Sequence, residues 1–278
     1  MKNNPLVSVI ITTKNEQDVI GDILESIKKQ TYQNSEIILV DNYSSDKTLK
    51  MAKEFTKKVF NKGPERSAQR NFGVKKALGE YVLILDADMV LTQKVLEEAV
   101  KLFKKEKEVG AVVIPEKSFG IGFWTKFKVF EREFYEGEDS IEAARFFRRT
   151  LFNKFGGYDK SITGPEDWDL PLRMRKAGIK IGRVKSFILH NERKFSPLKS
   201  ARKKFYYASH ARKYFKKHPE MVLSQGNLLL RPVFFKKWKK LILNPYLSLG
   251  MFLVRSIEMS AALFGIILSN TGKPKNKF

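Results

Sequence analysis

The chain has 278 residues, a net charge of +23 and no cysteine. The lack of cysteine excludes disulfides, thiolate zinc sites and a cysteine nucleophile. With 42% hydrophobic and 12% aromatic residues, the chain can bury a substantial core, and we expect one main domain with an appendage. The positive charge is concentrated between Lys185 and Lys240, where sixteen Lys or Arg face two acids. No secretory signal precedes the first apolar run at Leu6, so we expect the main domain to stay in the cytoplasm.

Strand and helix patterns alternate over the first 115 residues. A β-branched run at residues 6–12 predicts the first strand, and the apolar residues between Val19 and Ile27 recur at helical spacing. The further predicted elements are a strand at 36–40, a helix at 49–55, a strand at 58–60, a helix at 68–78, a strand at 81–85, a helix from 92 to 103 and a strand at 110–115. This alternation indicates an α/β fold whose mostly parallel sheet has helices on both faces.

Acidic residues stand where several of these strands end. Asp86 and Asp88 follow the strand at 81–85 and project to the same side, and Asp41 follows the strand at 36–40. Two carboxylates in this position suit a hard divalent cation, and such a cation suits a diphosphate. The alternative is that these acids only form the turn after the strand and cap the following helix. Acids on one edge of a parallel sheet, where open α/β sheets bind ligands, favour a site.

Several motifs, in this order, make the chain resemble the family 2 glycosyltransferases of the GT-A fold. The resemblance covers about residues 6–192 and implies a nucleotide-diphospho-sugar transferase fold. The motifs are Val7-Ser8-Val9-Ile10-Ile11-Thr12-Thr13-Lys14-Asn15-Glu16, Val40-Asp41-Asn42 with Ser44-Ser45-Asp46, Arg70-Asn71 with Gly73, Leu85-Asp86-Ala87-Asp88, Arg148-Arg149, Gly156-Gly157-Tyr158-Asp159, Gly164-Pro165-Glu166-Asp167-Trp168-Asp169-Leu170, Arg173 and Gly178.

The resemblance implies roles for individual residues on the donor side. Asp88 matches the direct ligand of a Mn²⁺ or Mg²⁺ that holds the diphosphate, and His190 matches a position at which some relatives supply a further metal ligand. Lys14 stands where many relatives have an aromatic residue that stacks on the base, so it is either a diphosphate contact or an exposed loop lysine. The residues matched to nucleotide-sugar binding are Thr12, Lys14, Glu16, Asp41, Arg70 and Asp86.

The resemblance also assigns the acceptor side. Asp167 matches the family's catalytic base, which takes the proton of an acceptor hydroxyl. Glu166 matches its neighbour, which binds the acceptor or supports the loop. The alternative for both is a pair of acids at a helix N-terminus, where they favour the helix dipole. Trp168 either packs beneath the acceptor sugar or belongs to the hydrophobic core. One base and no covalent nucleophile imply direct displacement with inversion.

Residues 116–143 contain none of the motifs that carry the resemblance to the family. Phe123, Phe127, Phe130 and Phe134 fall on one face of a predicted helix. Core packing is one interpretation of this stripe, and an acceptor-facing lid is the other.

We expect three regions: residues 1–115 for the nucleotide sugar, 116–192 for the acceptor and base, and 193–278 as a basic amphipathic extension. In the extension, apolar residues at 198–211 are flanked by lysine and arginine, a pattern typical of a helix at an anionic membrane surface. The runs 241–254 and 259–271 carry no charge, but each is shorter than the ~20 residues of a spanning helix. We therefore expect two interfacial or re-entrant helices; a single spanning helix and a soluble dimer face are the alternatives.

The resemblance, together with the basic extension, implies a metal-dependent inverting glycosyltransferase at the cytoplasmic face of the cell membrane. Its expected partners are a UDP or GDP sugar, a hydroxyl of a lipid-linked or envelope glycan, and an anionic membrane surface; a homodimer stays open. A polyprenyl phosphate is the alternative acceptor, but a phosphate needs no base. A nucleic-acid-binding protein would explain the charge but not the acids at the strand ends, and we expect no nucleic acid.

Overall fold

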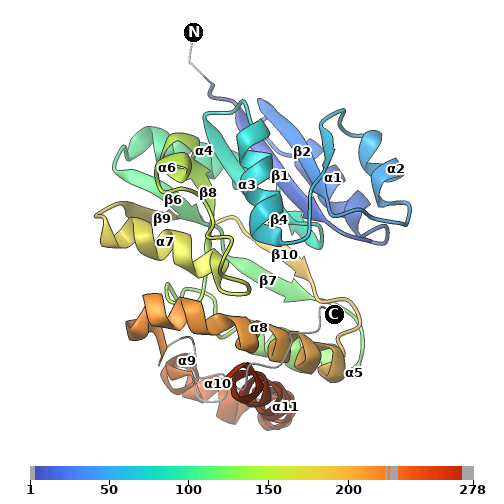
Figure 1. The fold of residues 1–278 in the computed structure, drawn as a ribbon, viewed down its shortest axis with the longest axis vertical. Helices are drawn as coiled ribbons and strands as arrows, with labels where there is room; N and C mark the ends of the chain where they lie inside the picture. Colours follow the sequence, from blue (N-terminus) through green and yellow to red (C-terminus); the bar gives the residue numbers. More distant parts are fainter. Residues whose placement is uncertain (1–3, 223–224, 226–230, 271–278) are drawn as a thin grey trace. The chain divides into compact units, whose positions relative to one another are not determined.

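A computed structural model describes residues 4–222, 225 and 231–270 and divides the chain into two compact units (Figure 1). The first unit comprises Met1–Glu116, Glu142–Lys160 and Glu166–Asn191. The second comprises Lys117–Ile141, Ser161–Pro165 and Glu192–Phe278. The units thus place residues 117–141 with the C-terminal helices, and the expected boundary at residue 192 stays a proposal.

A seven-stranded sheet forms the centre of the first unit, in the order β3-β2-β1-β4-β8-β6-β9. The strands β1 to β4 are parallel, β8 runs antiparallel to both β4 and β6, and β9 pairs parallel with β6. The sheet is therefore mostly parallel. Its strands are β1 (Val7–Thr13), β2 (Ser35–Asp41), β3 (Val59–Asn61), β4 (Tyr81–Asp86), β6 (Val109–Val113), β8 (Ala144–Arg148) and β9 (Lys180–Arg183).

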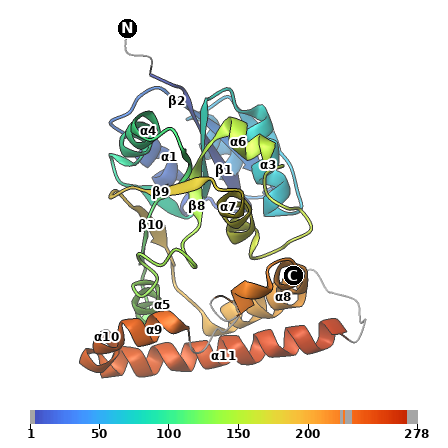
Figure 2. The same cartoon turned by 90° about the vertical axis from the view of Figure 1, so that its left-hand side faces the viewer.

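Helices cover both faces of this sheet, as the sequence predicts. One hydrophobic core lies between the sheet and the helices α1, α2 and α4. The other core lies between the sheet and α3, α6 and α7, and Figure 2 shows α1 and α4 on the opposite side of the strands from α3 and α6. The helices are α1 (Ile20–Lys28), α2 (Thr48–Lys53), α3 (Arg66–Lys76), α4 (Val95–Lys105), α6 (Arg149–Lys154) and α7 (Glu166–Lys176).

Alternating hydrophobic side chains explain why the sheet has two cores. Within β4, Leu83 and Leu85 belong to one core, whereas Val82 and Ile84 belong to the other. A strand that is buried on both faces has apolar residues at consecutive positions in the sequence. Close packing adds a further constraint at Gly73, because a Cβ there would meet Ile10 of β1 at 2.4 Å. This contact accounts for a glycine inside α3.

Three short strands form a second sheet in the order β5-β10-β7. They are β5 (Met89–Leu91), β10 (Ile188–Asn191) and β7 (Glu116–Phe119), and β7 carries the chain out of the first unit. In the first unit β10 pairs antiparallel with β5, with His190 opposite Met89. This pairing brings the end of β10 to the loop that follows β4.

Apart from the part of β7 after Glu116, the regular elements in the described part of the second unit are helices. A hydrophobic core of Phe130, Phe134, Tyr135, Val233, Phe234 and Met251 joins its helices. Of the phenylalanine stripe at 123–134, three members are buried and Phe123 is 57% exposed, so core packing is confirmed for those three. The elements are α5 (Phe123–Arg132), α8 (Pro197–Lys217), a 3₁₀ turn (Pro219–Met221), α9 (Pro232–Lys236), α10 (Trp238–Leu243) and α11 (Pro245–Asn270).

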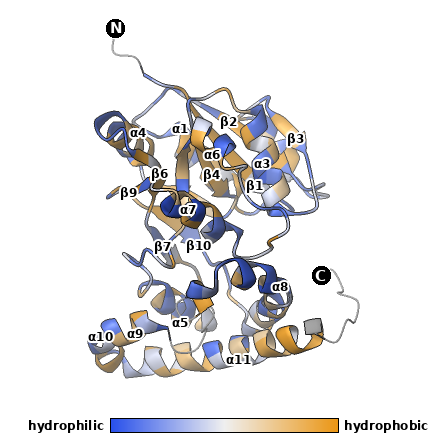
Figure 3. Ribbon diagram, turned by 60° about the vertical axis from the view of Figure 1, so that its left-hand side comes forward, coloured by the Kyte–Doolittle hydropathy of each residue, from blue (hydrophilic) through white to orange (hydrophobic). Residues whose placement is uncertain are grey.

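The expectation of two short C-terminal helices is wrong. The helix α11 is one continuous helix of 26 residues, seen lengthwise in Figure 2, and much of it is coloured as hydrophobic in Figure 3. Arg255 and Glu258, which separate the two apolar runs, lie inside the helix and are 1% and 2% exposed. Both residue types form helices well, so they do not interrupt one.

The second unit compensates these two charges internally. Arg255 pairs with Glu131 of α5, and Lys128 of α5 donates hydrogen bonds to Glu131 at 2.8 Å and to Glu258 at 3.3 Å. We call Lys128, Glu131, Arg255 and Glu258 the buried ion cluster. Buried charges are tolerated when they are paired in this way. The cluster therefore fixes which side of α11 faces α5.

Candidate active site

Arg70 on α3 connects acids from two distant parts of the first unit. Its Nη2 donates hydrogen bonds to both carboxylate oxygens of Asp86, at 2.8 and 3.0 Å. Its Nη1 contacts the carboxylates of Asp167 and Glu166, the latter at 3.3 Å. Arg70 is fully buried, and its guanidinium stacks over the ring of Tyr158. The residues matched to the donor side and to the catalytic base are therefore joined by one side chain.

The charges around Arg70 shift the pKa of neighbouring groups in opposite directions. Burial alone raises the pKa of Asp86, but the cations of Arg70, Arg66 and Arg145 outweigh burial and hold that pKa well below its ordinary value. Burial and the neighbouring Asp167 raise the pKa of Glu166. Asp86 is therefore the firmly ionised member, and Glu166 is the acid that takes up a proton more readily.

The Asp167 carboxylate is positioned by the start of α7. Glu166 and Asp167 occupy the first turn of this helix, where carboxylates are favoured by the dipole. Glu166 is buried, whereas the side chain of Asp167 is 21% exposed. The helix-cap interpretation therefore holds for both acids, and it is compatible with a catalytic one. Trp168 follows in the same turn and is half-buried.

A network around the turn at 156–158 holds α7 against α3. Asn71 donates a hydrogen bond to the Tyr158 carbonyl at 2.8 Å and accepts one from the Tyr158 N–H at 2.9 Å. Arg173 of α7 donates to the Gly157 carbonyl at 2.6 Å and to Asp169 at 2.7 Å. Gly157 has φ +67°, and a Cβ there would meet Asn71 at 2.6 Å, so glycine is required. These motif residues fix Asp167 relative to Arg70.

Asp88 and His190 lie together at the end of β4. The Asn191 N–H donates to the Asp88 carbonyl at 2.9 Å, and His190 Nε2 lies 3.4 Å from Asp88 Oδ2. On the other side of the ring, His190 Nδ1 lies 3.4 Å from Oε2 of Glu116, the first residue of β7. Burial alone lowers the pKa of His190, but the carboxylates of Asp88 and Glu116 raise it to about 10. The structure thus brings the two residues matched to metal binding into contact.

The donor atoms here fit a divalent cation that shares its coordination with a diphosphate. Oδ1 of Asp88 is buried and has no hydrogen-bond partner in the part of the chain that the structure describes. Among the same residues, no group of three or more His, Cys, Asp or Glu is arranged to hold a metal ion. Mg²⁺ commonly takes one or two carboxylates and completes its shell with waters and substrate phosphates. The Asp88 carboxylate, together with the His190 ring once that ring has given up its proton to bind the cation, is therefore a sufficient protein contribution.

The loops after β1 and β2 are tied to each other on the carboxyl edge of the sheet. The Asn15 N–H donates to Ser44 Oγ at 2.7 Å, and the Ser45 N–H donates to the Asn15 side chain at 2.9 Å. Asp41 is buried and accepts hydrogen bonds from the Ser44 N–H at 2.6 Å and from its hydroxyl at 2.5 Å. Thr12 donates to Asp86 at 3.1 Å. Strand order therefore places Asp41, Thr12 and Asp86 on adjacent strands.

Two other residues matched to the nucleotide sugar lie on the segment that follows β1. Lys14 is exposed, and Glu16 is half-buried at the start of the segment leading to α1, where its backbone N–H donates to Thr48 at 2.8 Å. Between the tied loops, Tyr43 is 69% exposed and has φ +53°. The sequence contained one signal for Tyr43: it is an aromatic residue in the loop that follows Asp41.

Further site residues were not singled out from the sequence. Arg145 of β8 donates to Glu116 at 2.6 Å and is buried, and Arg66 of α3 lies 3.4 Å from Glu166. Glu116 joins Arg145 to His190 on one carboxylate. No local sequence pattern identifies these residues, because each is distinguished only by the side chains that it contacts in the folded protein.

Comparison with known proteins is consistent with this geometry. The family model described as glycosyl transferase family 2 matches residues 8–159, which is more than half of the chain. A beta-monoglucosyldiacylglycerol synthase of Trichormus variabilis is 28% identical over 194 residues, which are 61% of this chain and 41% of that protein. An uncharacterised glycosyltransferase of Methanocaldococcus jannaschii is 26% identical, over 67% of this chain and 70% of that one. The chain thus spans about two fifths of the length of the synthase.

Solved structures show the same fold. A Pyrobaculum calidifontis mannosyltransferase in complex with GDP-Man and Mn²⁺ has a TM-score of 0.66 at 20% identity, covering 95% of this chain and 88% of that one. S. aureus TarS (residues 1–349) in complex with UDP has a TM-score of 0.55 at 17% identity, covering 96% and 92%. The mixed sheet with helices on both faces is therefore the GT-A fold, and by the match to its family model the chain belongs to glycosyl transferase family 2.

Proposed function

We propose that this protein is a metal-dependent inverting glycosyltransferase. It moves a sugar from a UDP or GDP sugar to a hydroxyl of a lipid-linked or envelope glycan. The observation that carries the proposal is the contact of Arg70 with both Asp86 and Asp167. One guanidinium thereby links the proposed donor-side acid to the proposed base, and such a link is expected where both substrates meet.

The donor is held by the carboxyl edge of the sheet. Asp41 and Thr12 lie at the ends of β2 and β1 and contact the nucleoside, with Asp86 near the ribose. Lys14 and Glu16 extend this surface along the loop after β1. Asp88 and His190 hold Mn²⁺ or Mg²⁺, and when bound this cation neutralises charge that develops on the departing diphosphate. Glu116 lies beside His190 Nδ1 and orients the ring, as carboxylates commonly do for metal-binding histidines.

Tyr43 supplies the base contact that Lys14 cannot make. Its ring is 69% exposed, and its loop is hydrogen-bonded to the loop that carries Lys14. An exposed aromatic ring held on a tied loop is suited to stacking on a nucleobase, because burying its faces is favourable and costs little conformational freedom. We therefore place the base beside Tyr43.

The transfer step needs one base. The oxygen of an acceptor hydroxyl attacks the anomeric carbon from the face opposite the diphosphate, and its proton passes to Asp167. The electron pair of the broken bond between the anomeric carbon and oxygen leaves with the nucleoside diphosphate, so the configuration inverts. General-base assistance of this kind contributes about 10²–10⁴-fold in rate. Glu166, Trp168 and Arg66 shape the acceptor side around Asp167. A phosphate acceptor would not need this base, so a hydroxyl is favoured.

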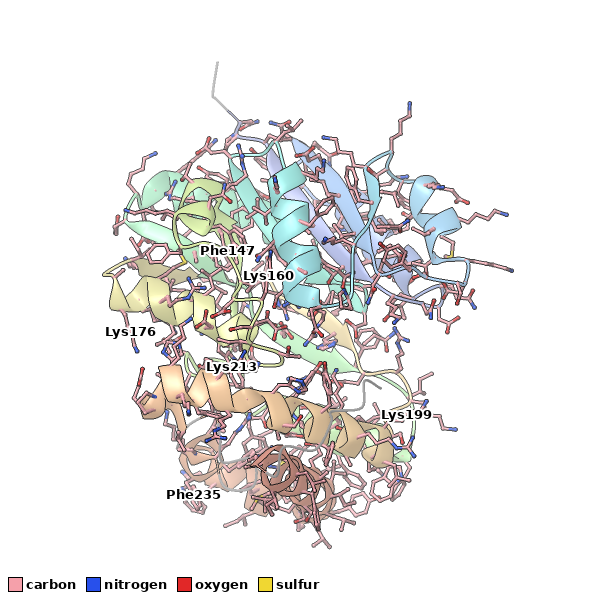
Figure 4. All side chains as sticks on the ribbon, in the orientation of Figure 1. Phe147, Lys160, Lys176, Lys199, Lys213 and Phe235 are labelled. Atoms are coloured by element: carbon pink, nitrogen blue, oxygen red, sulfur yellow. The ribbon has the colours of Figure 1, made fainter. Side chains whose placement is uncertain are left out.

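The acceptor is reached at an anionic membrane, at its cytoplasmic face. Pro245–Leu268 is, by length and composition, able to cross a membrane, but its two charges are held in the buried ion cluster, so we place α11 on the surface. Ile242, Leu243, Tyr246, Leu249 and Leu253 are each more than half exposed. Lysines accompany them on α9 and α10, and the exposed Phe235 and Lys199 are labelled in Figure 4. Apolar and aromatic residues beside lysine suit the headgroup region of a bilayer.

Calorimetric titration tests the donor side. UDP, GDP, UDP-glucose and GDP-mannose are titrated into the full chain with Mn²⁺ and with excess EDTA. We expect one base series to bind, with affinity that depends on Mn²⁺. If a folded protein binds no member of either series, the transferase proposal is wrong.

A further inference from the structure

An exposed apolar turn links β7 to α5 in the second unit. Residues 119–123 read Phe-Gly-Ile-Gly-Phe, and we call them the apolar turn. Ile121 is 82% exposed, Phe123 57% and Phe119 40%. Three large hydrophobic side chains within five residues are thus presented to solvent, which costs free energy unless something covers them.

The backbone holds this turn in one shape. The Ile121 N–H donates to the Arg193 carbonyl at 3.1 Å, and the Thr125 hydroxyl donates to the Ile121 carbonyl at 2.8 Å. A Cβ at Gly120 would meet the Arg193 carbonyl at 2.6 Å, and Gly122 has φ +119°. Glycine is therefore needed on both sides of Ile121. The turn therefore holds the Ile121 side chain in an exposed position.

The apolar turn is connected to α11 by aromatic contacts. The ring of Phe123 packs on Phe127 at 5.3 Å between centroids, and Phe127 packs on Tyr246 of α11 at 5.5 Å. Lys126 donates a hydrogen bond to the Tyr246 hydroxyl at 2.6 Å and lies 4.5 Å above the Phe123 ring. Tyr246 begins the line of exposed residues that continues with Leu249 and Leu253. The turn is therefore joined to α11 by ring contacts through Phe127, which is itself buried.

The charge around the apolar turn is mostly positive. The acid nearest to the turn is Glu192, whose N–H donates to the Phe119 carbonyl at 2.8 Å, and its side chain is only 11% exposed and lies 3.1 Å from Arg132. Residues 117–126 contain two lysines and no acid, and residues 193–204 contain six Lys or Arg and no acid. On α11 the acid Glu258 is buried. Basic side chains beside aromatic rings complement the phosphate groups of anionic lipid, whose headgroup region accepts amphipathic rings and lysines together.

We propose that the apolar turn is a second membrane anchor, with Ile121 and Phe123 inserted among the acyl chains of an anionic bilayer beside α11. The proposal rests on the membrane association proposed above and adds an element outside the C-terminal region. A second anchor on the turn restricts the tilt of the second unit on the bilayer more than α11 alone does.

Trp124 provides a local reporter. Its ring lies 5.1 Å from that of Phe123, and the chain has three tryptophans, at 124, 168 and 238. In a full-length W168F/W238F background, Trp124 fluorescence is measured on vesicles of phosphatidylcholine and phosphatidylglycerol that carry bromine at defined acyl positions. We expect a blue shift and quenching that is strongest for bromine near the headgroups.

A matched pair of serine variants tests the energetics. Ile121→Ser should weaken vesicle partitioning about tenfold, the factor that corresponds to burying one large aliphatic side chain. Leu78→Ser is the control, because Leu78 is 67% exposed in the first unit and should leave partitioning unchanged. Both variants alter exposed side chains, and circular dichroism checks that they are folded.

The outcomes separate this proposal from the one on which it rests. Wild-type binding with an unquenched Trp124 and no effect of Ile121→Ser overturns the second anchor and leaves α11 as the anchor. A folded wild-type protein that ignores anionic vesicles overturns both. If Ile121→Ser instead dissociates a dimer in sedimentation velocity, a second copy covers the turn and the membrane assignment is wrong.

Discussion

Arg70 and Asp86 form a two-bonded ion pair, with Nη2 of the arginine 2.8 and 3.0 Å from the two carboxylate oxygens. Arg70 has no exposed surface, so the pair is largely removed from water. The cost of burying the arginine is met by three carboxylates, of which Asp86 contributes two oxygens. The pair therefore contributes to folding and to the shape of the site at once.

Removal of this cation should destabilise the protein. Arg70→Met leaves Glu166 buried without Arg70 as a partner and deprives Asp86 of both hydrogen bonds, so we expect a loss of about 3–5 kcal/mol in the free energy of unfolding. Urea denaturation followed by circular dichroism measures it. Arg66→Met is the matched control: its side chain is 36% exposed, and it should cost no more than about 1 kcal/mol. Equal effects of the two variants would contradict the central position given to Arg70.

Asp167→Asn should separate binding from transfer. Asn is close in shape and can still accept a hydrogen bond from Arg70, so the Kd for the donor should stay within about twofold. Transfer to an acceptor should fall by about 10²–10⁴-fold, because no carboxylate takes the hydroxyl proton. Calorimetry and a product assay with a lipid-linked acceptor measure the two quantities. Lost donor binding would instead assign Asp167 a structural role.

Asp88→Asn should remove the effect of Mn²⁺ on nucleotide binding. An amide is a poorer ligand for a hard cation than a carboxylate. We expect the nucleotide diphosphate to bind the variant equally with Mn²⁺ and with EDTA. Asp22→Asn, which changes an exposed acid on α1, should behave as the wild type. Retention of the full Mn²⁺ effect in Asp88→Asn would rule out Asp88 as a ligand.

Tyr43→Ala should weaken binding of the nucleotide about fivefold, the loss expected for one aromatic stacking contact. Tyr43→Phe keeps the ring and should bind as the wild type. Lys14→Ala tests the neighbouring loop in the same calorimetric series. If the base stacks on Tyr43, Tyr43→Ala should lose affinity for nucleoside analogues. If the diphosphate contacts Lys14, Lys14→Ala should lose affinity for diphosphate analogues. An unchanged Kd in Tyr43→Ala would refute the stacking role.

Lys204 on α8 carries an unfavourable charge at neutral pH. Burial lowers the pKa of Lys204 from 10.5 to about 8, with Lys128 and Arg231 adding to the shift against the attraction of Glu258. Between these two pH values the unfolded chain binds more protons, so this group makes stability rise with pH. We therefore expect Lys204→Met to be more stable than the wild type at pH 7, by about 1–2 kcal/mol.

The same difference should shrink as the pH rises from 8 towards 10.5, because wild-type Lys204 is then neutral in the folded state and no longer buries a charge, and the unfolded state also begins to lose its proton. Urea titrations of both proteins at pH 7 and pH 10 measure it, and the pairwise comparison cancels the other titrating groups. A difference that grows with pH would show that the charged form of Lys204 is favoured in the folded protein.

The first strands and helices could be predicted because their signals are local. Continuous apolar runs predicted β1, β2 and β4 to within about two residues, and helical spacing predicted α1 and α3. By contrast β8 was missed, because its five residues include Arg145 and Arg148. Arg145 is buried against Glu116, and Arg148 donates to the carbonyl of Val109 at 2.8 Å. A strand that buries charge against distant partners has no recognisable apolar run.

For the proposed site, the sequence indicated where its residues lie, whereas their roles stay predictions. The positions of Asp41 and Asp86 follow from where the predicted strands end. Carboxylates at these positions indicate a site for a divalent cation and a diphosphate. The contact of Arg70 with Asp167 joins residues 97 positions apart, so no spacing in the sequence could reveal it. The two-helix expectation for residues 241–271 failed for a related reason: Arg255 and Glu258 interrupt an apolar pattern, but their partners on α5 remove the need for an interruption in the helix.

The buried ion cluster also decides how α11 is oriented about its own axis. Rolling the helix would separate Arg255 and Glu258 from Lys128 and Glu131 of α5, at a cost of several kcal/mol. The uncharged side is therefore turned outward even when no lipid is present. In a detergent-free buffer it will adsorb to surfaces, and it will drive self-association as the protein is concentrated. Purification yield and specific activity should consequently rise when a mild detergent or nanodiscs are added before concentration.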